Sequence, residues 1–276
     1  MQQIKNFLYK CFLTLNIFSY PIYADLALDK YIVPIDLEHT TSGIPTIDCI
    51  YVINLEKRPE KWVKCKNEFS EYFIYPNRVN AFEGWKLTKK QLQKLMGKYP
   101  IRMRGGQMGC LISHLSAIKD GYDRGFECIW ICEDDVIFCQ NPHILSDHIL
   151  NLYQTCPNWD ILFTDMDSKD INGNPILSVS SDFRPCFPHA HPFFYLKKDT
   201  VNDDFMKIRQ RFGAYSMIIS RNGMHKILNH FSNLPVWTAY DIDIHYILDI
   251  QEYALTNEVV TSRCSAISDT ELENHE

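Results

Sequence analysis

The sequence predicts a single α/β domain built on a mostly parallel sheet, because short apolar runs alternate with segments of helical periodicity. The apolar runs cover residues 47–54, 128–132, 159–163 and 215–219, and β-branched and aromatic residues are frequent in them. The chain has 276 residues, of which 46% are hydrophobic and 22% charged, so one domain can bury a complete core.

The N-terminal part is expected to lie outside this domain. In residues 1–24, Lys5 and Lys10 precede a short apolar stretch at 11–18 and Ala24 could close a cleavage site, which is typical of a signal peptide. Polar residues interrupt the stretch, so a transmembrane helix is not expected and a membrane-surface segment is the alternative. Residues 25–46 lack periodicity and are expected to be a linker, which leaves residues 47–276 for the domain.

Three helices are predicted in the first half of the domain. Pro59 suits the first turn of a helix that runs to about residue 69. Thr88 and Gln91 form a capping-box pattern before a second helix. Apolar residues from Met108 to Ile118 recur at helical spacing and predict an amphipathic third helix.

The second half of the domain repeats this alternation. Asn141 and Pro142 predict an N-cap and first turn for a helix to about residue 153. Residues 168–192 have the composition of a long surface loop, and acceptor recognition is expected within residues 168–212. Ser220 is expected to cap a further helix, and residues 244–250 to form a short one.

Charge and cysteine content exclude several classes of protein. The net charge is −6 and no basic run exceeds two residues, so nucleic-acid binding is not expected. The ten cysteines contain no CxxC pair and no zinc-finger spacing, and several lie in apolar stretches. They are therefore expected to be reduced thiols.

Three consecutive carboxylates, Glu133, Asp134 and Asp135, follow the apolar run at 128–132. Adjacent carboxylates repel one another unless a positive charge lies among them, and a hard divalent cation prefers oxygen ligands. Alternation along an extended segment would place Glu133 and Asp135 on one side and Asp134 on the other. The triplet predicts a metal-assisted site for an anionic ligand, and a solvated acidic turn is the alternative.

The chain resembles glycosyltransferase family 25, which includes lipopolysaccharide-biosynthesis glycosyltransferases and collagen galactosyltransferases. The resemblance extends over residues 47 to about 250 and is carried by four motifs in order: VINLEKRP at 52–59, NAFEG at 80–84, GCLISH at 109–114 followed by EDDV at 133–136, and GAYSMIISRNG at 213–223. The departures are modest, since Cys132 stands where the family usually has Leu, and Met224 where a small residue is common.

The resemblance implies a GT-A-like, Rossmann-type α/β/α sandwich. It implies transfer of galactose or a related hexose, with inversion, from a nucleotide-sugar donor such as a UDP-sugar to a glycan or glycolipid acceptor such as lipopolysaccharide. Mn²⁺ or Mg²⁺ is the expected cofactor. A degenerate domain that binds a sugar or a partner without turnover is the alternative, and a metal-dependent phosphoesterase is less consistent with a single acidic cluster.

The resemblance also assigns expected roles to individual residues. The metal ligands would be Glu133, Asp134 and Asp135, with His245 as an additional ligand. One of Asp241 and Asp243 would be the general base, unless they only cap the helix that follows. The residues expected to contact the donor are Asn54, Arg58, Asn80, Glu83, Gly84 and Ser113.

Several of these residues have an ordinary structural alternative. Arg58 could be a solvated residue at the start of a helix, and residues 80–84 could simply form a turn. His114 falls at the edge of the apolar stripe of its helix. This position suits a half-buried side chain that points into a crevice and has a catalytic role. The alternative is a structural His at the edge of the core. Asp165 and Asp167 follow another apolar run and could either join the site or cap a loop.

Reduced cysteines and the lack of any Asn-x-Ser/Thr sequon favour a cytoplasmic location, at or near a membrane surface. Nucleotide sugars are made in the cytosol, which agrees with this placement. The signal-like residues 1–24 favour the alternative of export or an ER-type lumen.

Overall fold

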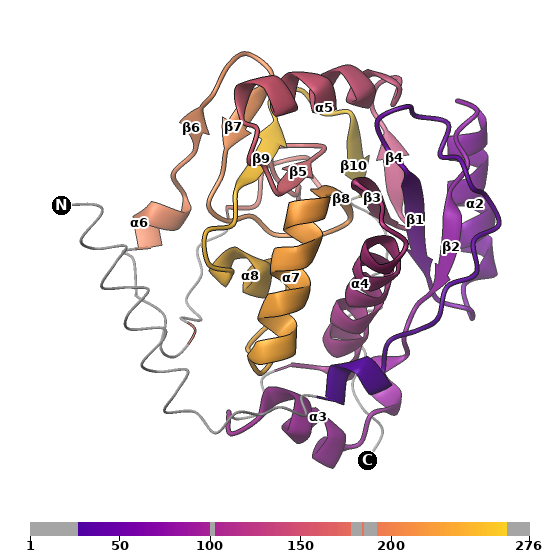
Figure 1. Cartoon of the computed structure of the whole chain (residues 1–276), viewed down its shortest axis with the longest axis vertical. Helices are drawn as coiled ribbons and strands as arrows, with labels where there is room; N and C mark the ends of the chain where they lie inside the picture. The colour runs from indigo at the N-terminus through magenta and orange to yellow at the C-terminus, as the bar shows by residue number, and fades with distance from the viewer. Residues whose placement is uncertain (1–26, 100–102, 178–183, 185–191, 264–276) are drawn as a thin grey trace.

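The computed structural model of the chain describes residues 27–99, 103–177, 184 and 192–263. The signal-like segment 1–24 and much of the predicted loop at 168–192 lie outside these residues. Figure 1 shows helices packed on both faces of a central sheet, which confirms the predicted α/β class.

The central sheet of the described residues has eight strands in the order β2-β1-β3-β8-β5-β9-β7-β6. The strands are β1 (Cys49–Asn54), β2 (Asn77–Asn80), β3 (Cys128–Glu133), β5 (Ile161–Phe163), β6 (Asp199–Thr200), β7 (Phe205–Lys207), β8 (Ser216–Ser220) and β9 (Glu252–Leu255). A separate pair joins β4 (Val136–Phe138) to β10 (Val260–Ser262).

Most strands of the central sheet share one direction. β1 is parallel to both β2 and β3, and β5 is parallel to β9. β8 is antiparallel to its neighbours β3 and β5, and β7 is antiparallel to β9 and β6. The sheet is therefore mixed, with two reversed strands, while β1, β2 and β3 bring their carboxyl ends to the same edge.

Alternating side chains of the strands build one core on each face of the sheet. Tyr51 belongs to the core that contains α4 (Gly105–Asp123) and α7 (Arg221–Asn233), and Val52 belongs to the core that contains α2 (Pro59–Ser70) and α5 (Ile144–Thr155). In Figure 1, α4 and α7 lie side by side over the front of the sheet. The period of two along each strand thus produces a three-layer sandwich.

Shorter helices complete the domain. They are η1 (Ala27–Lys30), η2 (Gly84–Lys86), α3 (Lys89–Met96), α6 (Pro192–Tyr195), α8 (Tyr240–Asp243) and η3 (Ile244–Tyr246). Within the described ranges, no helix combines the length and the apolar character that crossing a membrane requires.

Three predicted helix starts are confirmed. Pro59 occupies the first turn of α2. Thr88 and Gln91 form a reciprocal capping box at the start of α3, and the Ser220 hydroxyl accepts a hydrogen bond from the Gly223 N–H at the start of α7. In each case local side-chain chemistry alone determines the boundary.

The prediction that α4 is amphipathic is wrong, since 13 of its 19 residues are buried. The sheet, α7 and η2 pack around it, so polar residues such as Ser113, His114 and Ser116 are enclosed as completely as the apolar ones. The apolar stripe in the sequence indicates only the face toward the sheet.

The expected linker, residues 25–46, also proves to be part of the domain where it is described. Leu28 and Ile35 are buried in the core on the α4 side, and the Val33 N–H donates to Ser116 Oγ at 2.9 Å. A segment without periodicity can still pack when single apolar side chains fill gaps between helices.

Two further helix predictions need correction. The helix after the Asn141–Pro142 pair begins at Ile144, and Asn141 instead accepts from the His143 N–H in the preceding turn. Helical structure is present at 240–246, in α8 and η3, rather than at 244–250.

The contact between η2 and α4 predicts a strong effect of one methyl group. A Cβ at Gly109 would lie 2.4 Å from the Phe82 carbonyl oxygen and 2.8 Å from the Gly84 nitrogen, which are backbone atoms. Gly109→Ala is expected to lower the free energy of unfolding by about 1–3 kcal/mol, despite the better helix propensity of Ala. Gly121→Ala is the matched control in the same helix, because its Cβ would meet side-chain atoms of Ile129 and Met224, which can shift, and no backbone atom. Equal stability of the two variants in urea denaturation would contradict this reasoning.

Candidate active site

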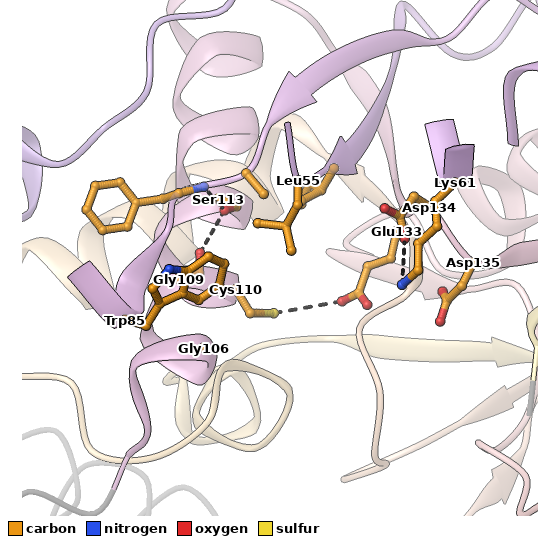
Figure 2. Close-up of a pocket in the computed structure, with 13 residues that line it drawn as sticks. Leu55, Lys61, Trp85, Gly106, Gly109, Cys110, Ser113, Glu133, Asp134 and Asp135 are labelled. Carbon is orange, nitrogen blue, oxygen red and sulfur yellow. Dashed lines mark hydrogen bonds and ion pairs between the residues drawn. The ribbon is translucent and has the colours of Figure 1, made fainter. Parts of the chain in front are cut away.

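A cleft lies at the carboxyl ends of β1 and β3, between η2, the first half of α4 and the turn after β3 (Figure 2). It opens to solvent, and its position beyond the carboxyl ends of the strands is the usual place for a ligand in an α/β sheet. Gly106, Gly109, Cys110 and Ser113 present one face of α4 to it. Its remaining wall consists of Ile53, Leu55, Lys61, Ala81, Phe82, Trp85, Glu133, Asp134 and Asp135.

The three consecutive carboxylates lie in this cleft but not on an extended segment. Glu133 is the last residue of β3, and Asp134 and Asp135 form a turn before β4. The expected alternation of the three side chains therefore does not apply. Figure 2 shows Glu133 directed at Cys110 on α4, with the Lys61 ammonium group beside Asp134.

Asn54 holds Asp134 in place. Its amide donates to Asp134 Oδ2 at 2.6 Å and to the Arg58 carbonyl at 2.9 Å, while its oxygen accepts from the Arg78 guanidinium. Lys61 Nζ lies 3.7 Å from Asp134 Oδ1. Asn54 is buried and occupied by these contacts, so the expectation that it contacts a donor is replaced by a positioning role.

Among the three carboxylates, Asp135 has the surroundings that best fit a bound cation. Its Oδ1 is buried and has no hydrogen-bond partner among the residues that the structure describes. Burial raises the pKa of Asp135 to about 7, and the negative charges of Glu133 and Asp134 add to the shift while Lys61 opposes it. A buried carboxylate oxygen of this kind fits a hard divalent ion, which would supply the missing partner.

Gly84 and Ser113, on the η2 side of the cleft, were expected to contact the nucleotide-sugar donor but act mainly in packing. Gly84 lies against the backbone of Gly105 and Gly109, so its lack of a side chain serves helix contact. Ser113 Oγ donates to the Gly109 carbonyl at 2.7 Å and accepts from the Phe82 N–H at 2.8 Å, although it also lines the cleft.

Asn80, Glu83 and Arg58 do not line the cleft. Asn80 is exposed at the end of β2, Glu83 pairs with Lys86, and Arg58 lies at the entry of α2. Lys61, one turn further along α2, reaches the cleft in place of Arg58.

Trp85 is a cleft residue that sequence reasoning missed. The Lys57 ammonium group lies 3.9 Å from the centre of its ring, a cation–π contact at the cleft wall. The position of Trp85 directly after the NAFEG motif could have indicated a place in the site, but only the fold brings Trp85 next to Lys57.

His114 is fully buried, which corrects the expectation of a half-buried residue at a helix boundary. Its ring stacks on Tyr240 with centroids 4.7 Å apart, and Nε2 lies 3.3 Å from Glu133 Oε1. His114 therefore acts on the site through Glu133.

The structure distinguishes Asp241 from Asp243. Asp241 accepts from the Gly213 N–H at 2.8 Å, and its pKa is raised by burial and by Glu133, with Gly213 and His245 opposing. Asp243 is fully buried against Arg184 and accepts from the Trp237 N–H at 2.9 Å.

Burial acts to raise the pKa of Asp243, but Arg184 and His230 outweigh it and lower that pKa to about 2. Asp243 is therefore a structural ion-pair partner, and neither Asp caps a following helix. Asp241 alone lies within electrostatic range of Glu133.

The expected metal ligand His245 is committed elsewhere. Its Nδ1 lies 2.8 Å from Glu252, its Nε2 lies 3.1 Å from the backbone of Arg211, and its side chain is fully buried. With both ring nitrogens occupied, His245 cannot bind a metal without breaking these contacts.

Asp165 and Asp167 are also structural. Asp165 is buried with Arg211, Tyr215 and Thr261, and Asp167 pairs with Lys198. Neither joins the cleft.

Among the described residues, one group of three side chains brings metal-binding atoms within 4.8 Å of one another: Cys110, His114 and Glu133. The acidic triplet does not converge in this way, so an ion bound there would complete its coordination with ligand oxygens or water.

Comparison with known proteins agrees with this geometry. The model of glycosyltransferase family 25, described as an LPS biosynthesis protein, matches residues 47–244. A glycosyltransferase 25 family member of Aedes aegypti is 26% identical over 251 residues, which are 79% of this chain and 41% of that protein. Human procollagen galactosyltransferase 2 is 29% identical over 126 residues, 42% of this chain and 20% of that protein.

The human inactive glycosyltransferase 25 family member 3 is 29% identical over 135 residues, 45% of this chain and 22% of that protein. The chain thus spans less than half the length of each of these relatives. Because the family model covers most of the described domain, the chain belongs to glycosyltransferase family 25.

Proposed function

We propose that this chain is a metal-assisted glycosyltransferase that moves a hexose from a nucleotide-sugar donor to a glycan or glycolipid acceptor. The observation that carries the proposal is the Oδ1 of Asp135 in the cleft of a family 25 domain, which is buried and has no partner within the described ranges of the chain. Galactose is the first sugar to test, since one relative is named a procollagen galactosyltransferase. The family description makes a lipopolysaccharide acceptor the first glycolipid to test.

The cleft offers groups of suitable chemistry for such a donor. Asp135, with Asp134 and Glu133 beside it, would hold Mn²⁺ or Mg²⁺, and the ion would neutralise the leaving diphosphate. Lys61 adds positive charge at the same wall. Trp85, with Lys57 on its ring, offers a flat surface on which a base such as uracil could stack.

Asp241 is the proposed general base. An inverting transfer requires a carboxylate that takes the proton from the acceptor hydroxyl as the new glycosidic bond forms. Asp241 lies within electrostatic range of Glu133, and its raised pKa increases its basicity. The Gly213 N–H orients one carboxylate oxygen.

The second candidate function is binding of a sugar or a partner without turnover. It is favoured by similarity to a relative named inactive and by the lack of convergence among the three acidic side chains. Release of UDP from UDP-hexoses, measured with Mn²⁺ and with EDTA, separates the two functions, because only a transferase releases UDP with metal dependence.

A cytoplasmic or membrane-associated location is proposed with this function. The seven cysteines of the described residues are all free, as expected for a reducing compartment. Export or an ER-type lumen is the alternative. Cell fractionation with N-terminal sequencing tests it: a chain that begins at Asp25 in an exported fraction would contradict the cytoplasmic placement.

Asp135→Asn tests the metal site through stability. Because the pKa of Asp135 is raised from its unfolded value to about 7, its ionisation costs stability as pH rises through that range. Without metal at pH 8, the Asn variant is expected to be the more stable, by on the order of a few kcal/mol. Mn²⁺ should raise the melting temperature of the parent protein but not that of the variant. Asp147→Asn, at an exposed position of α5, is the control, and an equal Mn²⁺ response in Asp135→Asn would refute the assignment.

The two aspartates of α8 are expected to give opposite results. Asp241→Asn should lower kcat by roughly 10²–10⁴ with little change in donor affinity or melting temperature. Asp243→Asn removes the charge that opposes buried Arg184 and should instead destabilise the fold by about 3 kcal/mol or more. Donor turnover and thermal melting measured side by side check both outcomes. Normal turnover in Asp241→Asn would sink its assignment as the base.

A further inference from the structure

Helix α4 directs two potential metal ligands at the end of β3. Cys110 and His114 are four residues apart and lie on the same face of the helix. Cys110 Sγ lies 3.8 Å from Glu133 Oε1, and His114 Nε2 lies 3.3 Å from the same oxygen. All three ligand atoms lie within 4.8 Å of one another.

These separations are close to those of a tetrahedral metal site. Zinc–ligand distances of about 2.3 Å to sulfur and about 2.0 Å to nitrogen or oxygen require ligand atoms roughly 3.3–3.6 Å apart. The nitrogen–oxygen separation already has this value, and the sulfur–oxygen separation exceeds it by only a few tenths of an ångström. The sulfur lies within 4.8 Å of the nitrogen and would move closer to it when an ion binds.

The site combines a rigid wall with an open side. The His114 ring is fully buried and is held by its stack on Tyr240, at 25° between planes. Cys110 and Glu133 line the cleft, so a fourth ligand position faces solvent and substrate. Three protein ligands with one open position is the arrangement of catalytic rather than structural zinc sites.

The local charge also favours a cation. Glu133 contacts both other ligands, and Asp241 places a second carboxylate within electrostatic range of Cys110 and Glu133. Carboxylates grouped in this way repel one another unless a positive charge lies among them.

We propose that Cys110, His114 and Glu133 form a binding site for a divalent transition-metal ion of the Zn²⁺ or Co²⁺ class. A thiolate and an imidazole select such ions over Mg²⁺ and Mn²⁺, which prefer oxygen. On binding, the Cys110 S–H bond breaks, its proton leaves to the solvent, and a sulfur–metal bond forms.

This site differs from the Mn²⁺ or Mg²⁺ site of the proposed function in chemistry and in its ligands, although it shares Glu133 with the acidic triplet. It does not depend on turnover. An ion held here would withdraw Glu133 from the acidic triplet, so Zn²⁺ would compete with a donor-binding metal.

Moderate affinity is expected, because His114 lacks an outer partner. Its Nδ1 is buried without a hydrogen-bond partner in the part of the chain that the structure describes. Ligand histidines usually donate this second N–H to a carbonyl or carboxylate, which strengthens binding.

Titration of the full-length protein with Co²⁺ tests the site. One equivalent is expected to produce a thiolate-to-cobalt charge-transfer band in the near ultraviolet, and Zn²⁺ should abolish it by displacement. Cys110→Ser should lose the band and lower Co²⁺ affinity at least about ten-fold. Cys139→Ser, at an exposed cysteine outside the cleft, is the matched control and should retain the band.

The proposal is overturned if the parent protein shows no charge-transfer band, or if the band persists in Cys110→Ser. Glu133→Gln provides a second test and should weaken Co²⁺ binding while retaining the thiolate band at saturation. Asp135→Asn should keep the cobalt band while it loses the Mn²⁺ response. Loss of the cobalt band in Asp135→Asn would show that the ligand set is wrong, whereas loss of the Mn²⁺ response alone concerns only the proposed function.

Discussion

The crowding of negative charge at the end of β3 is the constraint on which the arrangement of the cleft depends. A buried strand delivers three carboxylates in a row, and each one meets a different environment. Glu133 contacts His114 of α4, and Asp134 is held by Asn54 and Lys61. Asp135 has a buried oxygen without a hydrogen-bond partner in the part of the chain that the structure describes. Because the carboxylates have different partners, β1, α2 and α4 all contribute residues to this edge of the sheet.

The sequence was sufficient for the fold class and for the position of this acidic edge, because both depend on local patterns. Alternating apolar runs identified the strands, and the Thr88 and Ser220 caps fixed helix starts through contacts three residues apart. The partners of the carboxylates could not be predicted in this way. Asn54 and Asp134 are 80 residues apart, and only the parallel register of β1 and β3 makes them neighbours.

The same limit explains the residues that were assigned wrongly. His114 was placed at the edge of an apolar stripe, but a helical projection cannot show that Tyr240 covers the ring from α8. The His245 imidazole is a suitable metal ligand by its chemistry, yet Glu252 and the Arg211 backbone occupy both its nitrogens. Asp241 and Asp243 are two residues apart and chemically identical, so local sequence gave no reason to prefer one.

Their environments differ because one turn of α8 sends the two side chains in different directions. Asp243 points into the protein, where Arg184 neutralises its charge. Asp241 lies close enough to Glu133 for the two charges to interact. A carboxylate that is fully neutralised by a buried guanidinium has a low pKa and is a poor base. A carboxylate near another negative charge has a raised pKa and accepts a proton more readily. Burial is the main cause of the raised pKa of Asp241, and repulsion by Glu133 adds to it. A cation in the cleft would weaken that repulsion. In the proposed function, metal binding and proton transfer would thus be coupled through Glu133, and the ion in the cleft would also affect the basicity of Asp241.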